Sequence, residues 1–211
     1  RWPALPGSTL ADVFPAHHVF SYADRIRRMM NVDTIALLQF HVWQDTWIDD
    51  PEFERIVSEL KRSGIIRAVG LSLNRWEPSN GLRALRTGLI DTVQVIYNIF
   101  DQSPEDELFP LCSELKIGVI ARVPFDEGGL TGTLTSDTIF PPDDWRSRYF
   151  CKENLLQTVE RADRLKELLL PGMSLPEMTL RFILANPAVS TVIPGMRCQH
   201  HFVADRACSD D

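Results

Sequence analysis

The chain has few cysteines, no excess of basic residues and no long apolar run. Its four cysteines are widely spaced without a CxxC pair, which argues against a disulfide framework and predicts reduced thiols in a cytoplasmic protein. The 22 lysines and arginines against 29 aspartates and glutamates give a net charge of -7, so we expect neither nucleic acid nor an anionic membrane as a main partner. No apolar stretch approaches the length of a membrane span, and the N-terminal residues show no signal-peptide pattern.

Cysteine and histidine gather near the end of the chain, and the sequence predicts no metal site there. The residues concerned are Cys198, His200, His201 and Cys208. They lie across a predicted helix and do not have the spacing of zinc ligands.

The remaining composition, 44% hydrophobic and 24% charged, is that of an ordinary globular protein, and we predict one domain over residues 1–211. Residues 1–19 are rich in proline and predict an irregular lead-in. Apolar runs predict strands at Ile35–Phe40, Arg67–Ser72, Thr92–Tyr97, Ile117–Arg122 and Thr191–Ile193. Periodic and capped segments predict helices at Phe20–Met30, Pro51–Ser63, Pro78–Thr87, Pro104–Leu115, Glu153–Leu170, Ser174–Ala185 and Gln199–Cys208. Residues 123–151 interrupt the alternation and predict a long functional loop.

Strands that alternate with helices predict an α/β fold with a parallel sheet, either an open doubly wound sheet or a (β/α) barrel. No GxGxxG follows a strand, so the dinucleotide-fold motif is missing. Polar residues follow or end the strands instead, beginning with His41 after the first. That position, at the carboxyl ends of parallel strands, is where barrels place their active sites, and we therefore predict a partial barrel of about five strands.

Five segments, in order and spacing, resemble the aldo-keto reductase family. They read LLQFHVW, IRAVGLSLN, DTVQVIYNIFDQ, GVIARVPFDEGGLTG and VSTVIPGMR, and the resemblance covers the chain from about Phe20 to about Cys208. The family implies a (β/α)8 barrel that binds NADP(H) at its carboxyl face and reduces the carbonyl group of a small molecule.

The resemblance also implies site residues. His41 falls on the catalytic histidine, which orients the substrate carbonyl. The positions implied to hold the nicotinamide carboxamide are Ser72, Asn74 and Gln94, and Arg122 falls where a side chain stacks on the nicotinamide ring. Gly128, Gly129 and Leu130 resemble the loop around the pyrophosphate. Gly195, Met196 and Arg197 resemble the segment that receives the adenosine 2′-phosphate, with Arg197 as the anion partner.

The chain departs from the family in its acid. The family uses a tyrosine, tuned by a lysine and an aspartate, on repeats that would precede this sequence. None of Tyr22, Tyr97 and Tyr149 has the matching context, and Val203 to Asp205 stand where the adenine-reading residues are expected. Two hypotheses follow: an aldo-keto reductase-like protein with impaired catalysis, or a non-enzymatic nucleotide-binding or assembly module. Because the first and last strands would be open edges, we expect a homo-oligomer.

Overall fold

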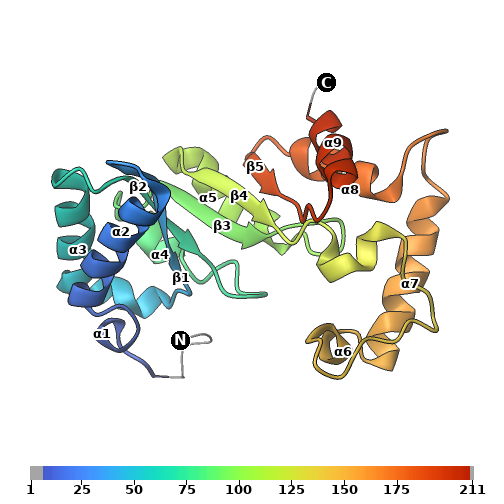
Figure 1. Ribbon diagram of the computed structural model, residues 1–211, viewed down its shortest axis with the longest axis horizontal. Helices are drawn as coiled ribbons and strands as arrows, with labels where there is room; N and C mark the ends of the chain where they lie inside the picture. Colours follow the sequence, from blue (N-terminus) through green and yellow to red (C-terminus); the bar gives the residue numbers. More distant parts are fainter. Residues whose placement is uncertain (1–6, 210–211) are drawn as a thin grey trace. The chain divides into compact units, whose positions relative to one another are not determined.

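The computed structural model describes residues 7–209, and these divide into two compact units. Unit 1 comprises the described residues up to Val95 together with Ser103–Ile120, and unit 2 comprises Ile96–Gln102 and the described residues from Ala121 onward. Five strands form one sheet in sequential order (Figure 1), namely β1 Ile35–His41, β2 Ile66–Ser72, β3 Thr92–Ile96, β4 Gly118–Arg122 and β5 Val189–Ile193. The predicted α/β class and the parallel strands are confirmed. The single-domain assignment stays a prediction.

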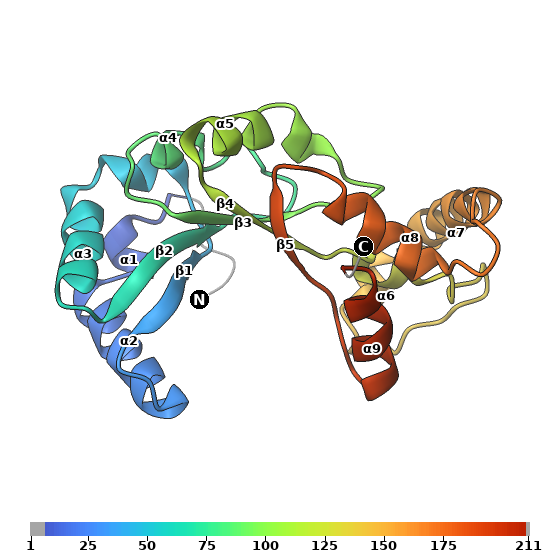
Figure 2. The same ribbon diagram turned by 90° about the horizontal axis from the view of Figure 1, so that it is seen from above.

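Unit 1 contains the first five helices in chain order. They are α1 Leu10–Val13, α2 Ala16–Met30, α3 Pro51–Arg62, α4 Leu82–Leu85 and α5 Leu108–Leu115, with 3-10 turns η1 Asp45–Asp49 and η2 Ser103–Glu105. Figure 2 shows α2 and α3 next to each other alongside β1 and β2. α3 forms as predicted: Asp50 accepts a hydrogen bond from the Glu52 N–H at 2.9 Å, and Pro51 occupies the first turn.

The core of this unit is aromatic where α3 meets β1. The Phe53 side chain, fully buried, lies 5.2 Å from the Phe40 ring and 4.8 Å from the Trp43 ring, measured between ring centroids. Trp47 packs edge-on against Trp43 at 5.7 Å. Because Phe40 faces α3, its neighbours on the strand, Gln39 and His41, point to the opposite face of the sheet.

Three predicted segments of unit 1 need correction. Residues 1–6 of the predicted lead-in lie outside the described residues, and the rest is not irregular throughout. α1 has a capping box between Thr9 and Asp12, and α2 begins at Ala16 because a proline is well tolerated just before the first helical turn. The helix predicted over Pro78–Thr87 is only the single turn of α4. The residues before α4 form a turn that Asn80 holds in place, because its side-chain amide donates a hydrogen bond to the Trp43 carbonyl at 2.8 Å.

The third correction concerns α5. It is shorter than the predicted helix, because the backbone of Glu107 (φ −132°, ψ −39°) separates it from the η2 turn.

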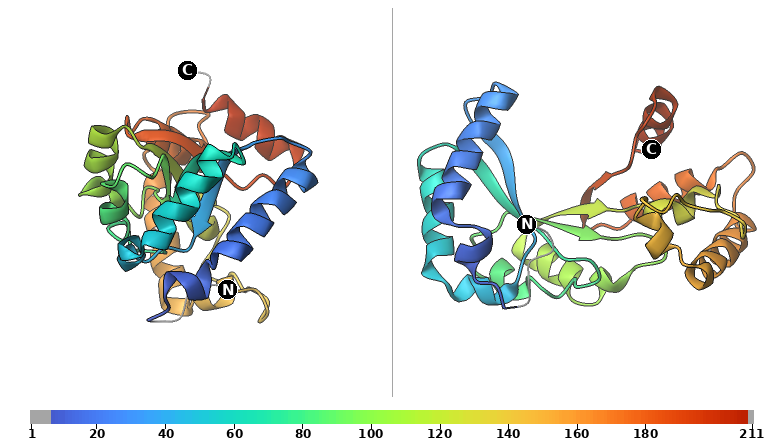
Figure 3. Two further views of the ribbon diagram at one scale, coloured as in Figure 1. Left: turned by 90° about the vertical axis from the view of Figure 1, so that its left-hand side faces the viewer. Right: turned by 60° about the horizontal axis from the view of Figure 1, so that its bottom comes forward.

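Unit 2 holds the remaining helices, which are α6 Arg146–Tyr149, α7 Lys152–Lys166, α8 Leu175–Leu184 and α9 Gln199–Ala207, with the 3-10 turn η3 Asp126–Thr131. α8 forms within the predicted segment Ser174–Ala185, and Ser174 caps it: its Oγ accepts a hydrogen bond from the Glu177 N–H at 3.2 Å. η3 packs against α7 and α8 and lies near the orange helices in Figure 3. The long loop at 123–151 is therefore partly ordered into η3 and α6.

The strand order makes β1 and β5 the two ends of the sheet, as predicted. Within the described residues, no helix is both long and apolar enough to cross a membrane.

Candidate cofactor and active site

Three of the predicted site residues form a row across β1, β2 and β3. His41 is paired in register with Ser72, and Ser72 is paired with Gln94. Because register partners in a parallel sheet project to the same face, the imidazole, hydroxyl and amide lie side by side on the face opposite α3. We refer to His41, Ser72 and Gln94 as the polar row.

The residues two positions earlier on each strand form a second row of register partners, namely Gln39, Gly70 and Thr92. Gln39 Nε2 donates a hydrogen bond to Gln94 Oε1 at 3.0 Å, which fixes the Gln94 carbonyl oxygen. A Cβ at Gly70 would lie 2.3 Å from Thr92 Oγ1, so only glycine fits between these two strands without a shift. Gln39 thus positions the amide of Gln94, and glycine at position 70 leaves the space that this arrangement needs.

The buried hydroxyl of Ser72 indicates which kind of ligand group fits the polar row. Its side chain is only 3% exposed, and its Oγ is buried without a hydrogen-bond partner among the described residues. A buried hydroxyl without a partner is costly, on the order of 1–3 kcal/mol. A ligand carrying both N–H donors and a carbonyl acceptor, such as a carboxamide, could satisfy it. The polar row therefore fits the nicotinamide end of a dinucleotide.

Asn74 has a structural role in the fold. Its Oδ1 accepts from the Trp43 N–H at 3.4 Å, and its Nδ2 donates to the Trp43 carbonyl at 2.9 Å and to Glu77 Oε2 at 2.8 Å. These bonds tie the loop after β2 to the loop after β1. The carboxamide contact implied for Asn74 stays a prediction, because its amide is already engaged.

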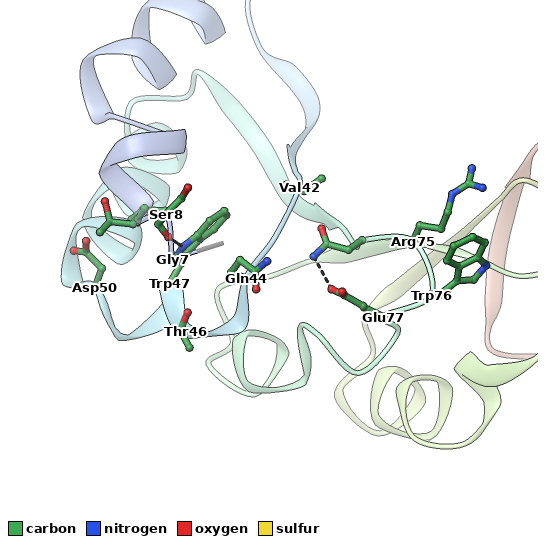
Figure 4. Close-up of a pocket in the computed structure, with 13 residues that line it drawn as sticks. Gly7, Ser8, Val42, Gln44, Thr46, Trp47, Asp50, Arg75, Trp76 and Glu77 are labelled. Carbon is green, nitrogen blue, oxygen red and sulfur yellow. Dashed lines mark hydrogen bonds between the residues drawn. The ribbon is translucent and has the colours of Figure 1, made fainter. Parts of the chain in front are cut away.

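A pocket of about 950 Å³ opens beside these two loops. Its walls come from the β1–α3 loop, the β2–α4 loop and the segment Gly7–Leu10. Figure 4 shows Trp47 next to this segment, where its indole N–H donates to the Ser8 carbonyl at 2.8 Å. On the other side of the pocket, Arg75 lies with its guanidinium carbon 5.1 Å from the centre of the Trp76 ring. The walls mix indole rings with hydroxyl, amide and charged groups.

His41 itself lines a second pocket of unit 1, of about 420 Å³, at the junction of α2 and β1. Tyr22 and His18 line the same pocket, with their rings stacked 5.8 Å apart. The other two tyrosines are bonded elsewhere: Tyr97 Oη accepts from Asn186 at 3.0 Å, and Tyr149 Oη donates to Asp126 at 2.6 Å. Tyr22 therefore shares this pocket with His41.

Unit 2 brings together residues from both segments that were implied to bind phosphate. Gly128, Gly195 and Arg197 line one pocket of about 590 Å³, which we call the Arg197 pocket. Gly128 has a φ of +115°, a conformation that favours glycine, so the loop can turn at this point. An anion can be bound by backbone N–H groups of a tight turn and by a guanidinium group. This pocket has both a turn, at Gly128, and the guanidinium of Arg197.

The other implied residues of unit 2 are not among those that line this pocket. Leu130 is fully buried, and a Cβ at Gly129 would lie 2.6 Å from Thr158 Cγ2, so both pack inward. Met196 is 48% exposed between Gly195 and Arg197. Arg122 ends β4, and its carbonyl accepts from the Tyr97 N–H at 3.3 Å. Their roles toward a cofactor stay predictions.

Sequence reasoning missed a second arginine of the Arg197 pocket. Arg146, at the start of α6, lines the pocket and forms an ion pair with Asp144. The Asp144 side chain is only 21% exposed. The spacing D-x-R before a short helix was the available signal, but charged pairs of this kind are common at helix starts. Only the fold shows that this pair faces Arg197.

The family model described as the aldo/keto reductase family matches residues 16–204. The chain is 28% identical over 172 residues to the NADH-specific methylglyoxal reductase of Escherichia coli (strain K12), covering 79% of this chain and 51% of that protein. It is 28% identical over 195 residues to the aldo-keto reductase YhdN of Bacillus subtilis (strain 168), covering 86% of this chain and 58% of that one. The chain thus spans little more than half the length of these relatives.

The fold agrees with the sequence comparison. The holo form of the aldo-keto reductase AKR11C1 from Bacillus halodurans superimposes with a TM-score of 0.69 at 27% identity, over 93% of this chain and 60% of that one. The five parallel strands with flanking helices are therefore part of a (β/α) barrel. The chain belongs to the aldo/keto reductase family.

Proposed function

We propose that this chain binds a nicotinamide dinucleotide, with NADP(H) as the preferred form, and serves in the reduction of a small-molecule carbonyl. The observation that carries the proposal is the polar row. Here the buried hydroxyl of Ser72, which has no hydrogen-bond partner in the described part of the chain, lies between His41 and Gln94. When bound, the dinucleotide supplies the hydride. In unit 1, Ser72 and Gln94 would hold a nicotinamide carboxamide. In unit 2, taken by itself, Gly128, Gly195 and Arg197 would hold a phosphate group.

His41 is the residue of the chain suited to act on the substrate. It lies in the polar row and lines the pocket of about 420 Å³, and it is the position that the family resemblance assigns to orienting the substrate carbonyl.

We propose further that catalysis by this chain alone is weak. Two of its three phenols are hydrogen-bonded away from the polar row, and Tyr22 is 51% exposed. A positioned acid contributes roughly 10²–10⁴-fold to proton transfer, and a side chain that is half exposed is not held in position for that role. The same observation favours the second candidate, a nucleotide-binding or assembly module without turnover.

Two measurements separate these functions. Fluorescence titration with NADPH tests binding, and an assay with 4-nitrobenzaldehyde tests reduction. We expect saturable binding and a rate near background. Binding with no turnover at all favours the non-enzymatic module, whereas turnover that falls in His41→Ala favours the reductase. Robust turnover that survives His41→Ala would remove His41 from its role, and Tyr22→Phe then tests whether that phenol is the acid.

Cofactor preference is tested at Arg197. A hydrogen bond to a charged group is worth about 1.5–3 kcal/mol, or roughly 10- to 150-fold in affinity. Arg197→Ala should therefore weaken NADPH by this factor and NADH much less. The matched control is Arg206→Ala, an exposed arginine of α9 outside the pocket lining, which should change neither. Equal losses for both cofactors at Arg197 would count against its proposed contact with the 2′-phosphate.

A further inference from the structure

The Arg197 pocket contains as many carboxylates as guanidinium groups. Arg146 and Arg197 line it together with Asp144 and Glu127. A pocket meant only to bind a dianion would gain from an excess of positive charge. The two carboxylates therefore reduce the positive charge of the pocket, and Asp144 does so through direct contacts with Arg146.

Asp144 holds Arg146 by a fork of hydrogen bonds. Arg146 Nε lies 3.1 and 3.0 Å from the two carboxylate oxygens, and Nη2 lies 2.6 Å from Oδ2. The backbone N–H of Arg146 also donates to Oδ1 at 3.0 Å. The guanidinium lies 4.9 Å from the centre of the Phe140 ring, which further restricts its position. The pair is thus preorganised, with one edge of the guanidinium already occupied.

Asp144 also interacts with the other arginine. Hydrogen bonds from Arg146 lower the pKa of the Asp144 carboxyl, and the positive charge of Arg197 lowers it further. The carboxyl is therefore ionised at neutral pH. Its negative charge offsets the positive charge of Arg146. It also lowers the positive potential of the pocket in which Arg197 would receive a phosphate.

We propose that Asp144 sets the balance between NADPH and NADH in this chain. Its carboxylate competes with the 2′-phosphate for the two guanidinium groups and repels that phosphate, so it reduces the preference for NADPH that Arg197 and Arg146 would otherwise impose. This inference rests on the proposed binding of a nicotinamide dinucleotide. Asp144 is a specificity-determining residue in this account, and it takes no part in the chemistry.

The test is Asp144→Asn, which removes the charge but keeps an oxygen that can accept from Arg146. The dissociation constants of NADPH and NADH are measured by fluorescence titration, and their ratio is compared with that of the parent. We expect the preference for NADPH to rise roughly tenfold, mainly through tighter NADPH binding. Asp143→Asn, the same charge change at the adjacent exposed residue outside the pocket lining, should leave the ratio unchanged.

Two more variants separate charge from folding. Asp144→Glu keeps the charge and should retain the parental ratio. Adding Arg146→Gln to Asp144→Asn should remove most of the gain, because the freed guanidinium is its source. An unchanged or lowered NADPH preference in Asp144→Asn would overturn the inference while leaving the proposed function intact. If the parent binds neither cofactor, the proposed function fails, and this inference fails with it.

Discussion

Asp45 caps a helix that lies 38 residues further along the chain. The N-cap position of α4 is Gly81, which has no side chain. Asp45 takes over that role: its carboxylate accepts hydrogen bonds from the backbone N–H groups of Arg83 at 2.9 Å and Ala84 at 3.0 Å. It also accepts from the indole N–H of the buried Trp43 at 3.3 Å. We therefore expect Asp45→Ala to loosen both loops that wall the large pocket of unit 1.

The magnitude follows from these three donors. Loss of a helix cap costs about 0.5–2 kcal/mol. The indole N–H of Trp43 would be left buried without an acceptor, which costs a further ~1–3 kcal/mol. Allowing for partial relaxation of the loop, the free energy of unfolding of unit 1 should fall by about 2–4 kcal/mol. Urea denaturation followed by tryptophan fluorescence measures this loss, and amide hydrogen exchange at Arg83 and Ala84 reports the local opening.

A matched control is available close by. Asp49 lies in the same 3-10 turn and forms an ion pair with the Arg83 side chain, but its own side chain is 63% exposed. Asp49→Ala should cost about 0–1 kcal/mol, as exposed ion pairs do. If Asp45→Ala is no more destabilising than Asp49→Ala, and the amides of Arg83 and Ala84 keep their protection, the capping role is refuted.

Three further predictions concern packing, a thiol and assembly. Gly70→Ala should destabilise unit 1 by about 1–3 kcal/mol, since the new methyl group would lie 2.3 Å from Thr92 Oγ1; an unchanged urea midpoint would contradict this. Burial raises the pKa of the Cys112 thiol to about 12, so it stays protonated at lower pH; mass spectrometry after iodoacetamide treatment at pH 8 should find the exposed Cys151 alkylated and Cys112 not. The edges at β1 and β5 should cause self-association, and light scattering that shows a stable monomer at micromolar concentration would refute it.

Much of the secondary structure could be predicted because its signals are local. Asp50 and Pro51 at the start of α3, and Ser174 at the start of α8, lie next to the helices that they begin. The start of α2 was missed, because a proline-rich segment suggests irregular structure whether or not a helix follows. The predicted helix at Pro78 failed for a different reason: the residues before α4 are held by hydrogen bonds to the loop after β1.

The candidate site was predictable only where a motif carried it. His41, Ser72 and Gln94 were proposed from the resemblance, and the strand register places them in one row. The Asp144–Arg146 pair had no such motif. Its position beside Arg197, more than fifty residues later, depends on how the loop folds against the end of β5.

The sequence by itself determined the alternation of strands and helices, and with it the parallel sheet, because side-chain periodicity and helix caps act over a few residues. It also determined which residue types stand at the strand ends. The tertiary structure alone decided which of these groups meet. Among the described residues, the Ser72 hydroxyl is buried without a hydrogen-bond partner. Asn74 is engaged by Trp43, and Asp45 caps α4, because loops distant in sequence pack together. Hydrogen bonds and charges act over a few ångströms in space, and the distance along the chain does not encode that proximity.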